Sequence, residues 1–228
     1  MQRISTALAE VRHRVQVAAE RAERDPADVT LVAVSKTWPA EIAREAFDAG
    51  AVHLGENRVH EGVAKKPVVP EATWHLIGPL QRNKARAALG AFDVVQTVDR
   101  WSIAERLQRV LGEEWPERRL PVLVEVNVGA EKQKAGVPPD EAAELISRCF
   151  GCANLHVQGL MAIPPWSSDP EATRSHFRTV AELRDRLQQG LGRALPQLSM
   201  GMSHDFEVAI AEGATIVRVG TAIFGPRG

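Results

Sequence analysis

The chain of 228 residues contains no tyrosine and only two cysteines, too few for a disulfide framework. No apolar run approaches the roughly 20 residues that a transmembrane helix needs. The first residues open an amphipathic helix and do not resemble a signal peptide. The 28 basic residues are balanced by 29 acidic ones, so the sequence has no excess of positive charge that would indicate nucleic-acid binding. We therefore expect a cytoplasmic protein that binds neither membranes nor nucleic acids.

Strand-like and helix-like segments alternate along the whole chain, after an amphipathic helix over residues 3–24. We predict strands over residues 31–36, 52–55, 74–78, 93–98, 121–127, 155–161, 198–200 and 215–220. We predict helices over residues 39–49, 56–66, 81–89, 101–111, 140–149, 171–187 and 206–212. Such alternation implies parallel strands joined by right-handed crossovers.

Two architectures satisfy this pattern, a doubly wound open sheet and a closed barrel. No G-x-G-x-x-G motif follows the first strand, which weakens the nucleotide-binding version of the open sheet. Eight units in about 200 residues fit the small end of the barrel range. We therefore predict one (β/α)8 TIM barrel domain spanning residues 1–228, in which residues 1–25 form an extra helix packed on the barrel.

The first strand consists of four apolar residues, Leu31 to Val34, followed by Ser35 and Lys36, before Trp38-Pro39 ends the run. Apolar residues on both faces are typical of a parallel strand that is buried on both sides. A lysine at the end of such a strand can extend its ammonium into solvent. Burial instead lowers the pKa of a lysine, and the neutral amine is a nucleophile towards aldehydes. Both interpretations stay open for Lys36 at this point.

The loops after the seventh and eighth strands are rich in small residues, reading Ser199-Met200-Gly201-Met202-Ser203 and Gly220-Thr221-Ala222. In barrel enzymes these two loops commonly form a phosphate site at the carboxyl ends of the strands. The alternative is that glycine and serine merely suit tight turns. An amine on the first strand and a phosphate site nearby favour a phosphorylated aldehyde as ligand. Pyridoxal 5'-phosphate and a sugar phosphate bound by a Schiff-base aldolase both meet that description.

Arg218 lies inside the eighth strand between two valines, where an unpaired charge would be costly. An arginine that donates to a pyridine nitrogen would keep that nitrogen unprotonated and weaken the ring as an electron sink. An ion pair with a carboxylate such as Glu125 accounts for the position equally well.

Other candidates carry less weight. Cys149-Phe150-Gly151-Cys152 has C-x-x-C spacing but closes a predicted helix, whereas a thioredoxin-type pair opens one. The histidines His53, His75 and His204 are each typical of hydrogen-bonded structural residues. Two charged stretches, residues 81–86 and 131–134, are typical of solvated surface, although the lysines of the second could meet anions at the barrel mouth.

The chain resembles the pyridoxal phosphate homeostasis protein family, also called the YggS/PROSC proteins. The resemblance runs from the first strand to the last residues. The segments that carry it are residues 31–37, Gly55-Glu56-Asn57, residues 74–78 with Gln81, Asn83 and Lys84, Val126-Asn127 with Lys134 and Gly136, Gly159-Leu160-Met161, residues 199–203 with Asp205, and residues 218–221 with Phe224-Gly225.

The resemblance implies a fold-type III barrel like the N-terminal domain of alanine racemase, with pyridoxal 5'-phosphate bound as an aldimine on Lys36. It implies phosphate contacts at Ser203, Gly220 and Thr221, a pyridine nitrogen facing Arg218, and Asn57 near the ring. The resemblance implies a cofactor-binding regulator of vitamin B6 and amino-acid pools with no established reaction, and it suggests delivery of the cofactor to apo-enzymes as a partner role.

We expect no racemase activity. A two-base racemase on this barrel takes a tyrosine from an additional β-domain, and this chain has no tyrosine and ends three residues after Gly225. An amino-acid enzyme of the same fold and a Schiff-base aldolase remain alternatives, the latter predicting a colourless protein. We expect a monomer because the outer helices are charged.

Overall fold

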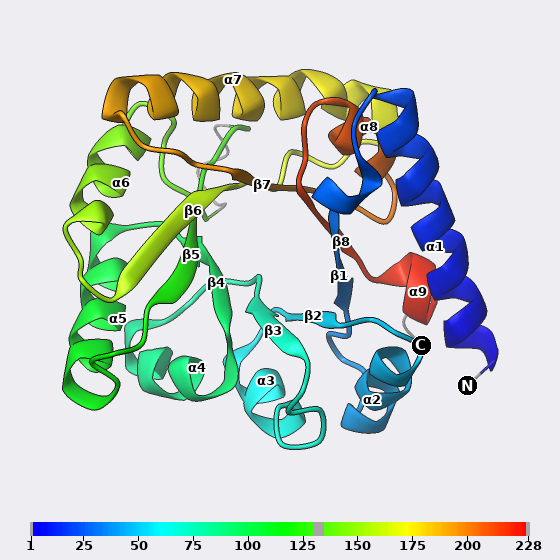
Figure 1. The fold of residues 1–228 in the computed structure, drawn as a ribbon, viewed down its shortest axis with the longest axis horizontal. Helices are drawn as coiled ribbons and strands as arrows, with labels where there is room; N and C mark the ends of the chain where they lie inside the picture. The colour runs from blue at the N-terminus through cyan, green and yellow to red at the C-terminus, as the bar shows by residue number, and fades with distance from the viewer. Residues whose placement is uncertain (1, 130–134, 227–228) are drawn as a thin grey trace.

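The computed structural model describes residues 2–129 and 135–226, and in it eight parallel strands form a closed barrel inside a ring of helices (Figure 1). The strands are β1 (Thr30–Val34), β2 (His53–Glu56), β3 (Thr73–Leu76), β4 (Val94–Val98), β5 (Leu120–Glu125), β6 (Leu155–Met161), β7 (Gln197–Met202) and β8 (Ile216–Val219). The α-helices are α1 (Gln2–Arg21), α2 (Ala40–Asp48), α3 (Val59–Lys65), α4 (Ala85–Ala91), α5 (Trp101–Glu114), α6 (Ala142–Phe150), α7 (Arg174–Leu191), α8 (Phe206–Ala211) and α9 (Thr221–Phe224). Short 3-10 turns are η1 (Pro26–Asp28), η2 (Arg82–Lys84) and η3 (Pro170–Thr173).

The barrel closes between its first and last strands. Thr30 of β1 pairs with Ile216 of β8, and Ala33 pairs with Val219. Each described strand therefore has a partner on both sides, whereas an open sheet leaves two edge strands. The predicted (β/α)8 barrel is confirmed and the doubly wound alternative is wrong.

Two separate groups of apolar side chains fill the structure, because successive strand residues point to opposite faces. The larger group lies between the strands and the surrounding helices. A smaller group, Val32, Leu123, Met161 and Ile216, forms a cluster of its own. Gly55 has to be small, since a Cβ there would lie 2.8 Å from Cγ1 of Val32. The remaining inward positions include polar side chains, and these build the site.

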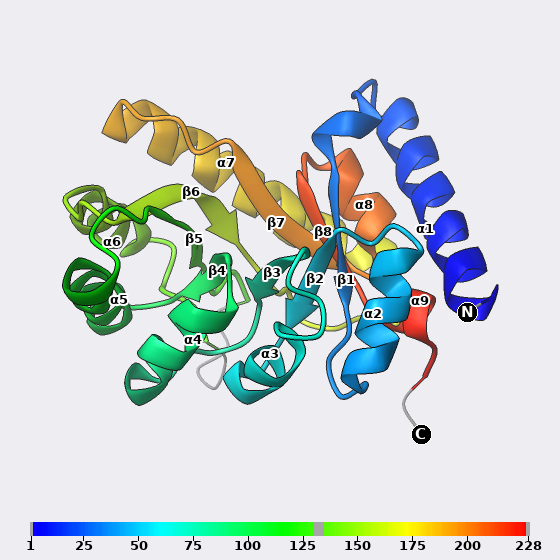
Figure 2. The ribbon, with the colours of Figure 1, turned by 60° about the horizontal axis from the view of Figure 1, so that its bottom comes forward.

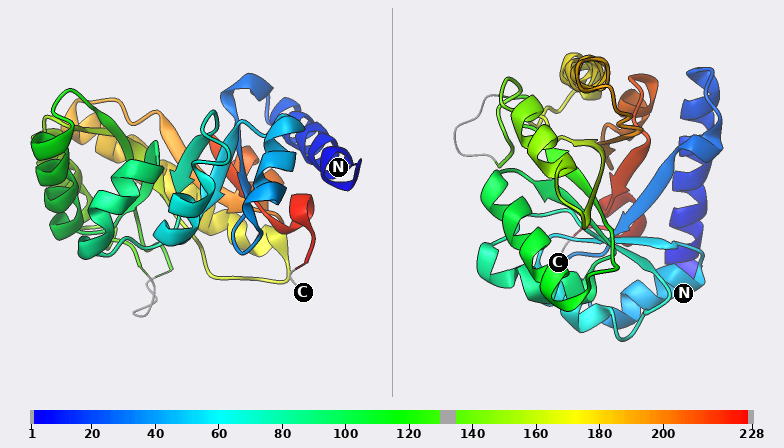
Figure 3. Two further views of the ribbon diagram at one scale, coloured as in Figure 1. Left: turned by 90° about the horizontal axis from the view of Figure 1, so that it is seen from below. Right: turned by 60° about the vertical axis from the view of Figure 1, so that its left-hand side comes forward.

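Helix α1 covers the seam of the barrel. It packs against α8 and α9, next to the strands that close the ring (Figures 2 and 3). The face of α1 that points inward carries Ile4, Leu8, Val11 and Val15, each less than a tenth exposed. This spacing of three or four residues is the one that predicted an amphipathic helix.

Several boundaries differ from those predicted, each for a local reason. Helix α3 begins at Val59 and not at residue 56, because Arg58 is extended and Glu56 still belongs to β2. The predicted helix over residues 81–89 begins as the 3-10 turn η2. Strand β7 continues through Gly201, whose φ of 89° and register shift the sequence did not indicate. Helix α9 was not predicted.

Candidate functional site

The predicted site residues gather at the carboxyl ends of four neighbouring strands. Lys36 follows β1, Asn57 follows β2, Ser203 follows β7, and Gly220 and Thr221 follow β8. In the closed barrel the strand order β7-β8-β1-β2 is continuous. Residues almost two hundred positions apart in the sequence therefore share one side of the mouth.

Lys36 is half-buried at the start of a tight turn. The next residue, Thr37, has a φ of 70°, a left-handed conformation that costs a β-branched residue about 1–3 kcal/mol. The backbone N–H of Thr37 donates to the carboxylate of Glu61 at 2.8 Å, and that of Trp38 donates to the Ser35 carbonyl at 3.1 Å. These contacts hold the strained turn and thereby position the Lys36 backbone.

A buried ionic network supports this turn from below. Nζ of Lys65 donates to Oε1 of Glu56 at 2.6 Å and to the Ser35 carbonyl at 2.8 Å. The Ser35 hydroxyl donates to the same Glu56 oxygen at 2.6 Å. Burial raises the pKa of Glu56 to about 7, although its hydrogen bonds to Lys65 and Ser35 act in the opposite direction. The role of Lys65 could not be recognised from the sequence, since a lysine in the last turn of a helix is ordinarily solvated.

The loops after β7 and β8 meet at the hydroxyl of Ser203. Its Oγ accepts the backbone N–H of Gly220 at 3.1 Å and that of Ala222 at 3.4 Å. The hydroxyl oxygen thus lies where an anion would meet the same two donors. The predicted juxtaposition of the two loops is confirmed by these contacts.

Arg218 is buried inside the barrel and pairs with neutral groups. Its Nη1 donates to Oγ of Ser199 at 2.6 Å and its Nη2 to the Ala162 carbonyl at 3.0 Å. Within the described residues no carboxylate lies at ion-pair distance from it, so the alternative of an ion pair with Glu125 is not realised. Burial lowers the pKa of Arg218 to about 10, against the opposing fields of Glu125 and Asp205.

Glu125 faces the same interior. Its Oε2 is buried and has no hydrogen-bond partner within the described residues. Burial and the nearby Asp99 raise its pKa to about 7, while Arg218 lowers it. A buried carboxylate oxygen with no hydrogen-bond partner among the described residues makes the group expensive to ionise, and groups with pKa values shifted in this way cluster at functional sites.

The loop after β2 is held close to the loop after β3. A Cβ on Gly78 would lie 2.2 Å from the carbonyl oxygen of Asn57, so only glycine permits this approach. The Thr97 hydroxyl donates to the Gly78 carbonyl at 2.9 Å. Half-buried Asn57 is thereby fixed beside the mouth.

The C-x-x-C pair lies at the end of α6 and not at this site. Cys149 is buried in the last turn of α6, and burial raises its thiol pKa to about 12 and raises that of Cys152. Neither thiol forms a disulfide. His204 stacks on Trp166 and contacts the Ser168 carbonyl at 3.1 Å. The charged stretch 131–134 lies outside the described residues.

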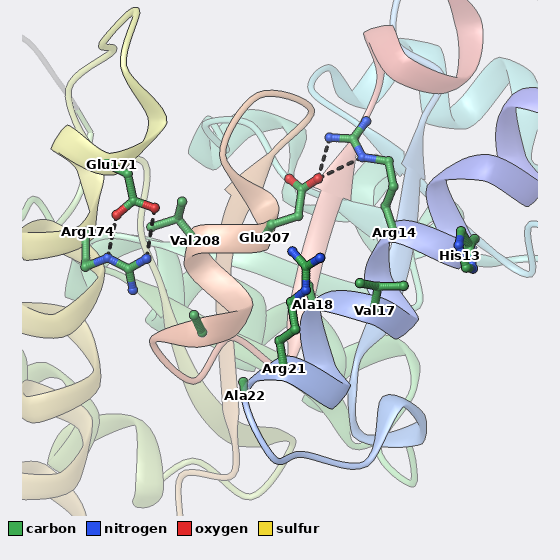
Figure 4. Close-up of a pocket in the computed structure, with 11 residues that line it drawn as sticks. His13, Arg14, Val17, Ala18, Arg21, Ala22, Glu171, Arg174, Glu207 and Val208 are labelled. Atoms are coloured by element: carbon green, nitrogen blue, oxygen red, sulfur yellow. Dashed lines mark hydrogen bonds and ion pairs between the residues drawn. The ribbon is translucent and has the colours of Figure 1, made fainter.

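A groove of about 470 Å³ lies elsewhere, between α1, α8 and η3 (Figure 4). Two ion pairs border it, Arg14 with Glu207 and Arg174 with Glu171. None of the predicted site residues lines this groove. The described residues hold no cluster of metal-ligating side chains, and none of the described helices combines the length and apolarity needed to cross a membrane.

Comparison with known proteins agrees with this architecture. The family model for the N-terminal domain of alanine racemase matches residues 6–228. An alanine racemase from Clostridium difficile, 13% identical, superimposes with a TM-score of 0.78 over all of this chain and 60% of its own, which shows a shared fold. The fold and site thus define a barrel of the alanine racemase N-terminal type.

Relatives of higher sequence identity identify the family to which the chain belongs. The pyridoxal phosphate homeostasis protein of Aquifex aeolicus is 45% identical over 96% of both chains, and that of Escherichia coli is 42% identical over all of this chain and 98% of its own. PipY of Synechococcus elongatus, solved with pyridoxal phosphate bound, is 38% identical with a TM-score of 0.84 over 97% of this chain and all of its own. The chain belongs to the pyridoxal phosphate homeostasis protein family.

Proposed function

We propose that this protein binds pyridoxal 5'-phosphate through Lys36 and serves the intracellular homeostasis of that cofactor. The observation that carries the proposal is the placement of Lys36, Ser203, Gly220 and Arg218 around one barrel mouth. It is supported by the PipY relative, which was solved with the cofactor bound.

The chemistry of the residues fits each part of the ligand. The Ser203 hydroxyl and the backbone N–H groups of Gly220 and Thr221 suit a phosphate, because neutral donors in a tight turn bind anions well. Arg218 suits the pyridine nitrogen, since it offers only donors. Asn57 would lie beside the ring. The cofactor would supply an aldehyde, which the amine of Lys36 would hold through a C=N bond, the aldehyde oxygen leaving as water.

The same residues favour a carrier over a catalyst. Arg218 stays protonated at neutral pH and can only donate hydrogen bonds. The pyridine nitrogen beside it would therefore have to accept and stay unprotonated, which would make the ring a weaker electron sink. A racemase needs a second base opposite the lysine, and the tyrosine that would serve is absent from the sequence. We propose that the protein is a cytoplasmic monomer that keeps the cofactor available and delivers it to apo-enzymes.

The absorbance spectrum of the purified protein after addition of pyridoxal 5'-phosphate tests the proposal. The wild type should show a visible band, and borohydride reduction should leave the cofactor mass on the peptide containing Lys36. Lys36→Ala should lose both signals, whereas Lys84→Ala, at an exposed lysine beside the mouth, should keep them.

A wild type that takes up no cofactor would overturn the proposal and favour the aldolase alternative. Rapid turnover of an amino acid by the loaded protein would overturn the carrier role alone. Transfer is tested separately, by mixing loaded protein with an apo-enzyme in the presence of a scavenger for free cofactor.

A further inference from the structure

A row of five hydrogen-bonded side chains crosses the barrel interior from Arg218 to the opposite end. Arg218 donates to Ser199 at 2.6 Å, and Ser199 donates to Oε1 of Gln96 at 2.6 Å. Nε2 of Gln96 lies 2.9 Å from Nδ1 of His75, and Nε2 of His75 lies 3.1 Å from Nδ1 of His53. The five side chains belong, in this order, to β8, β7, β4, β3 and β2.

Arg218 determines the direction of every hydrogen bond in the row, because a guanidinium can only donate. Ser199 accepts from it and must send its single proton to Oε1 of Gln96. The amide nitrogen of Gln96 then donates to Nδ1 of His75. His75 therefore carries its proton on Nε2 and donates to Nδ1 of His53. Both histidines are thereby confined to the neutral tautomer with the proton on Nε2.

The far end of the row opens towards solvent. His53, the first residue of β2, is half-buried and borders a cavity of about 340 Å³ beneath α1. Among the residues that the structure describes, Arg12 of α1 is the one charged residue that lines this cavity with His53, and no carboxylate does. From β3 the titratable group that faces it is His75. Burial lowers the pKa of His53, and burial together with His53 lowers that of His75 to about 3.

We infer that His53 is a remote positioning residue for Arg218, and that a proton on His53 releases the arginine from the hydrogen bond with Ser199 that holds it in place. This inference rests on the proposed function only in assigning Arg218 to the pyridine nitrogen. A protonated His53 presents an N–H to the N–H of His75. If His75 moves its proton to Nδ1, that N–H points at the N–H groups of the Gln96 amide. If the Gln96 amide then exchanges the positions of its oxygen and nitrogen, Ser199 loses the acceptor for its own proton. No arrangement of the row satisfies both a charged His53 and a fully bonded Ser199.

The first test uses protein without cofactor, so its result is independent of cofactor binding. Two-bond ¹H–¹⁵N correlation spectra of the imidazoles distinguish the histidine tautomers. At pH 8 His53 and His75 should both show the pattern of the proton on Nε2. In Gln96→Leu, His75 should become a mixture of tautomers. A wild-type His75 with its proton on Nδ1, or already a mixture, would overturn the inference.

The second test follows the absorbance band of the loaded protein between pH 8 and pH 5. The wild-type band should shift reversibly, with a midpoint below the ordinary pKa of histidine. His53→Gln offers an acceptor that does not titrate, so it should keep the pH 8 spectrum and lose the shift. His53→Lys, which only donates, should show the acid-form spectrum already at pH 8.

His156→Gln provides the control, because His156 is exposed on β6. It should titrate like the wild type. A shift that persists in His53→Gln would overturn the inference even if the tautomers are as expected. Failure of the wild type to take up pyridoxal 5'-phosphate would instead contradict the proposed function, and the tautomer spectra would still decide the role of the row.

Discussion

The ammonium of Lys65 lies 2.6 Å from the carboxylate of Glu56, and both side chains are almost completely buried. Removing one partner of a buried ion pair leaves a charge without compensation, at a cost of about 3–5 kcal/mol. Lys65→Met should therefore lower the free energy of unfolding by about that amount at pH 8, measured by urea titration.

Two further variants define this effect. Lys84→Met, at an exposed lysine, should stay within about 0.5 kcal/mol of the wild type. The double variant Glu56→Gln/Lys65→Met should recover part of the loss, because neither charge remains. A Lys65→Met protein as stable as the wild type at pH 8 would contradict the ionic role.

Glu125 makes stability depend on pH in a defined direction. Its pKa is about 7 in the folded protein and near 4.5 when unfolded, so between these values the folded state binds more protons. Its contribution is present below pH 4.5 and is lost as the pH rises towards 7, at up to about 1.4 kcal/mol per pH unit. Glu125→Gln should thus gain stability relative to the wild type as the pH rises from 4.5 to 8. Urea titrations of both proteins at several pH values check this, and a difference that is constant with pH would refute it.

Ser203 should strengthen the binding of pyridoxal 5'-phosphate but not that of pyridoxal. A hydrogen bond to a charged group contributes about 1.5–3 kcal/mol, so Ser203→Ala should weaken binding of pyridoxal 5'-phosphate roughly 10- to 100-fold. Pyridoxal, which lacks the phosphate, should bind the variant and the wild type alike. Fluorescence titrations with both ligands provide the measurement, and equal losses for the two would point to general damage at the mouth.

Gly78 should not tolerate a side chain. A Cβ there would lie 2.2 Å from the Asn57 carbonyl oxygen, and a backbone oxygen cannot move aside cheaply. Gly78→Ala should lower the midpoint of thermal unfolding by several degrees and weaken cofactor binding. Gly90→Ala is the matched control, because nothing lies within 4 Å of its Cβ in α4, and it should stabilise by up to about 1 kcal/mol.

The loaded protein should not racemise alanine. If Lys36 holds the cofactor as proposed, it serves one face of the ring, and the sequence has no tyrosine to return a proton on the opposite face. Chiral chromatography after long incubation with L-alanine should detect no D-alanine above the level given by free cofactor. Racemisation that disappears in Lys36→Ala would contradict this expectation.

The barrel could be predicted from the sequence because strands buried on both faces read as unbroken apolar runs, and eight of them alternate with amphipathic segments. Lys36, Ser203 and Gly220 could be selected because the carboxyl ends of barrel strands are where sites lie. Helix α9 was missed because four residues carry no periodicity.

The interior hydrogen-bond row could not be predicted. Gln96 and Ser199 are 103 residues apart, and although Ser199 opens a loop motif, nothing in the sequence links it to Gln96. Lys65 likewise matches the pattern of a solvated helix end. Such partners are brought together by closure of the barrel, which depends on the register of every strand.

The pairing of β1 with β8 has a consequence for synthesis of the protein on the ribosome. Lys36 is translated early, but Ser203, Arg218 and Gly220 follow much later, and β1 lacks one of its neighbours until then. At about 5–20 residues per second the chain spends on the order of ten seconds or more with Lys36 made and this side of the mouth incomplete. The growing chain therefore cannot complete this mouth until β8 has been made.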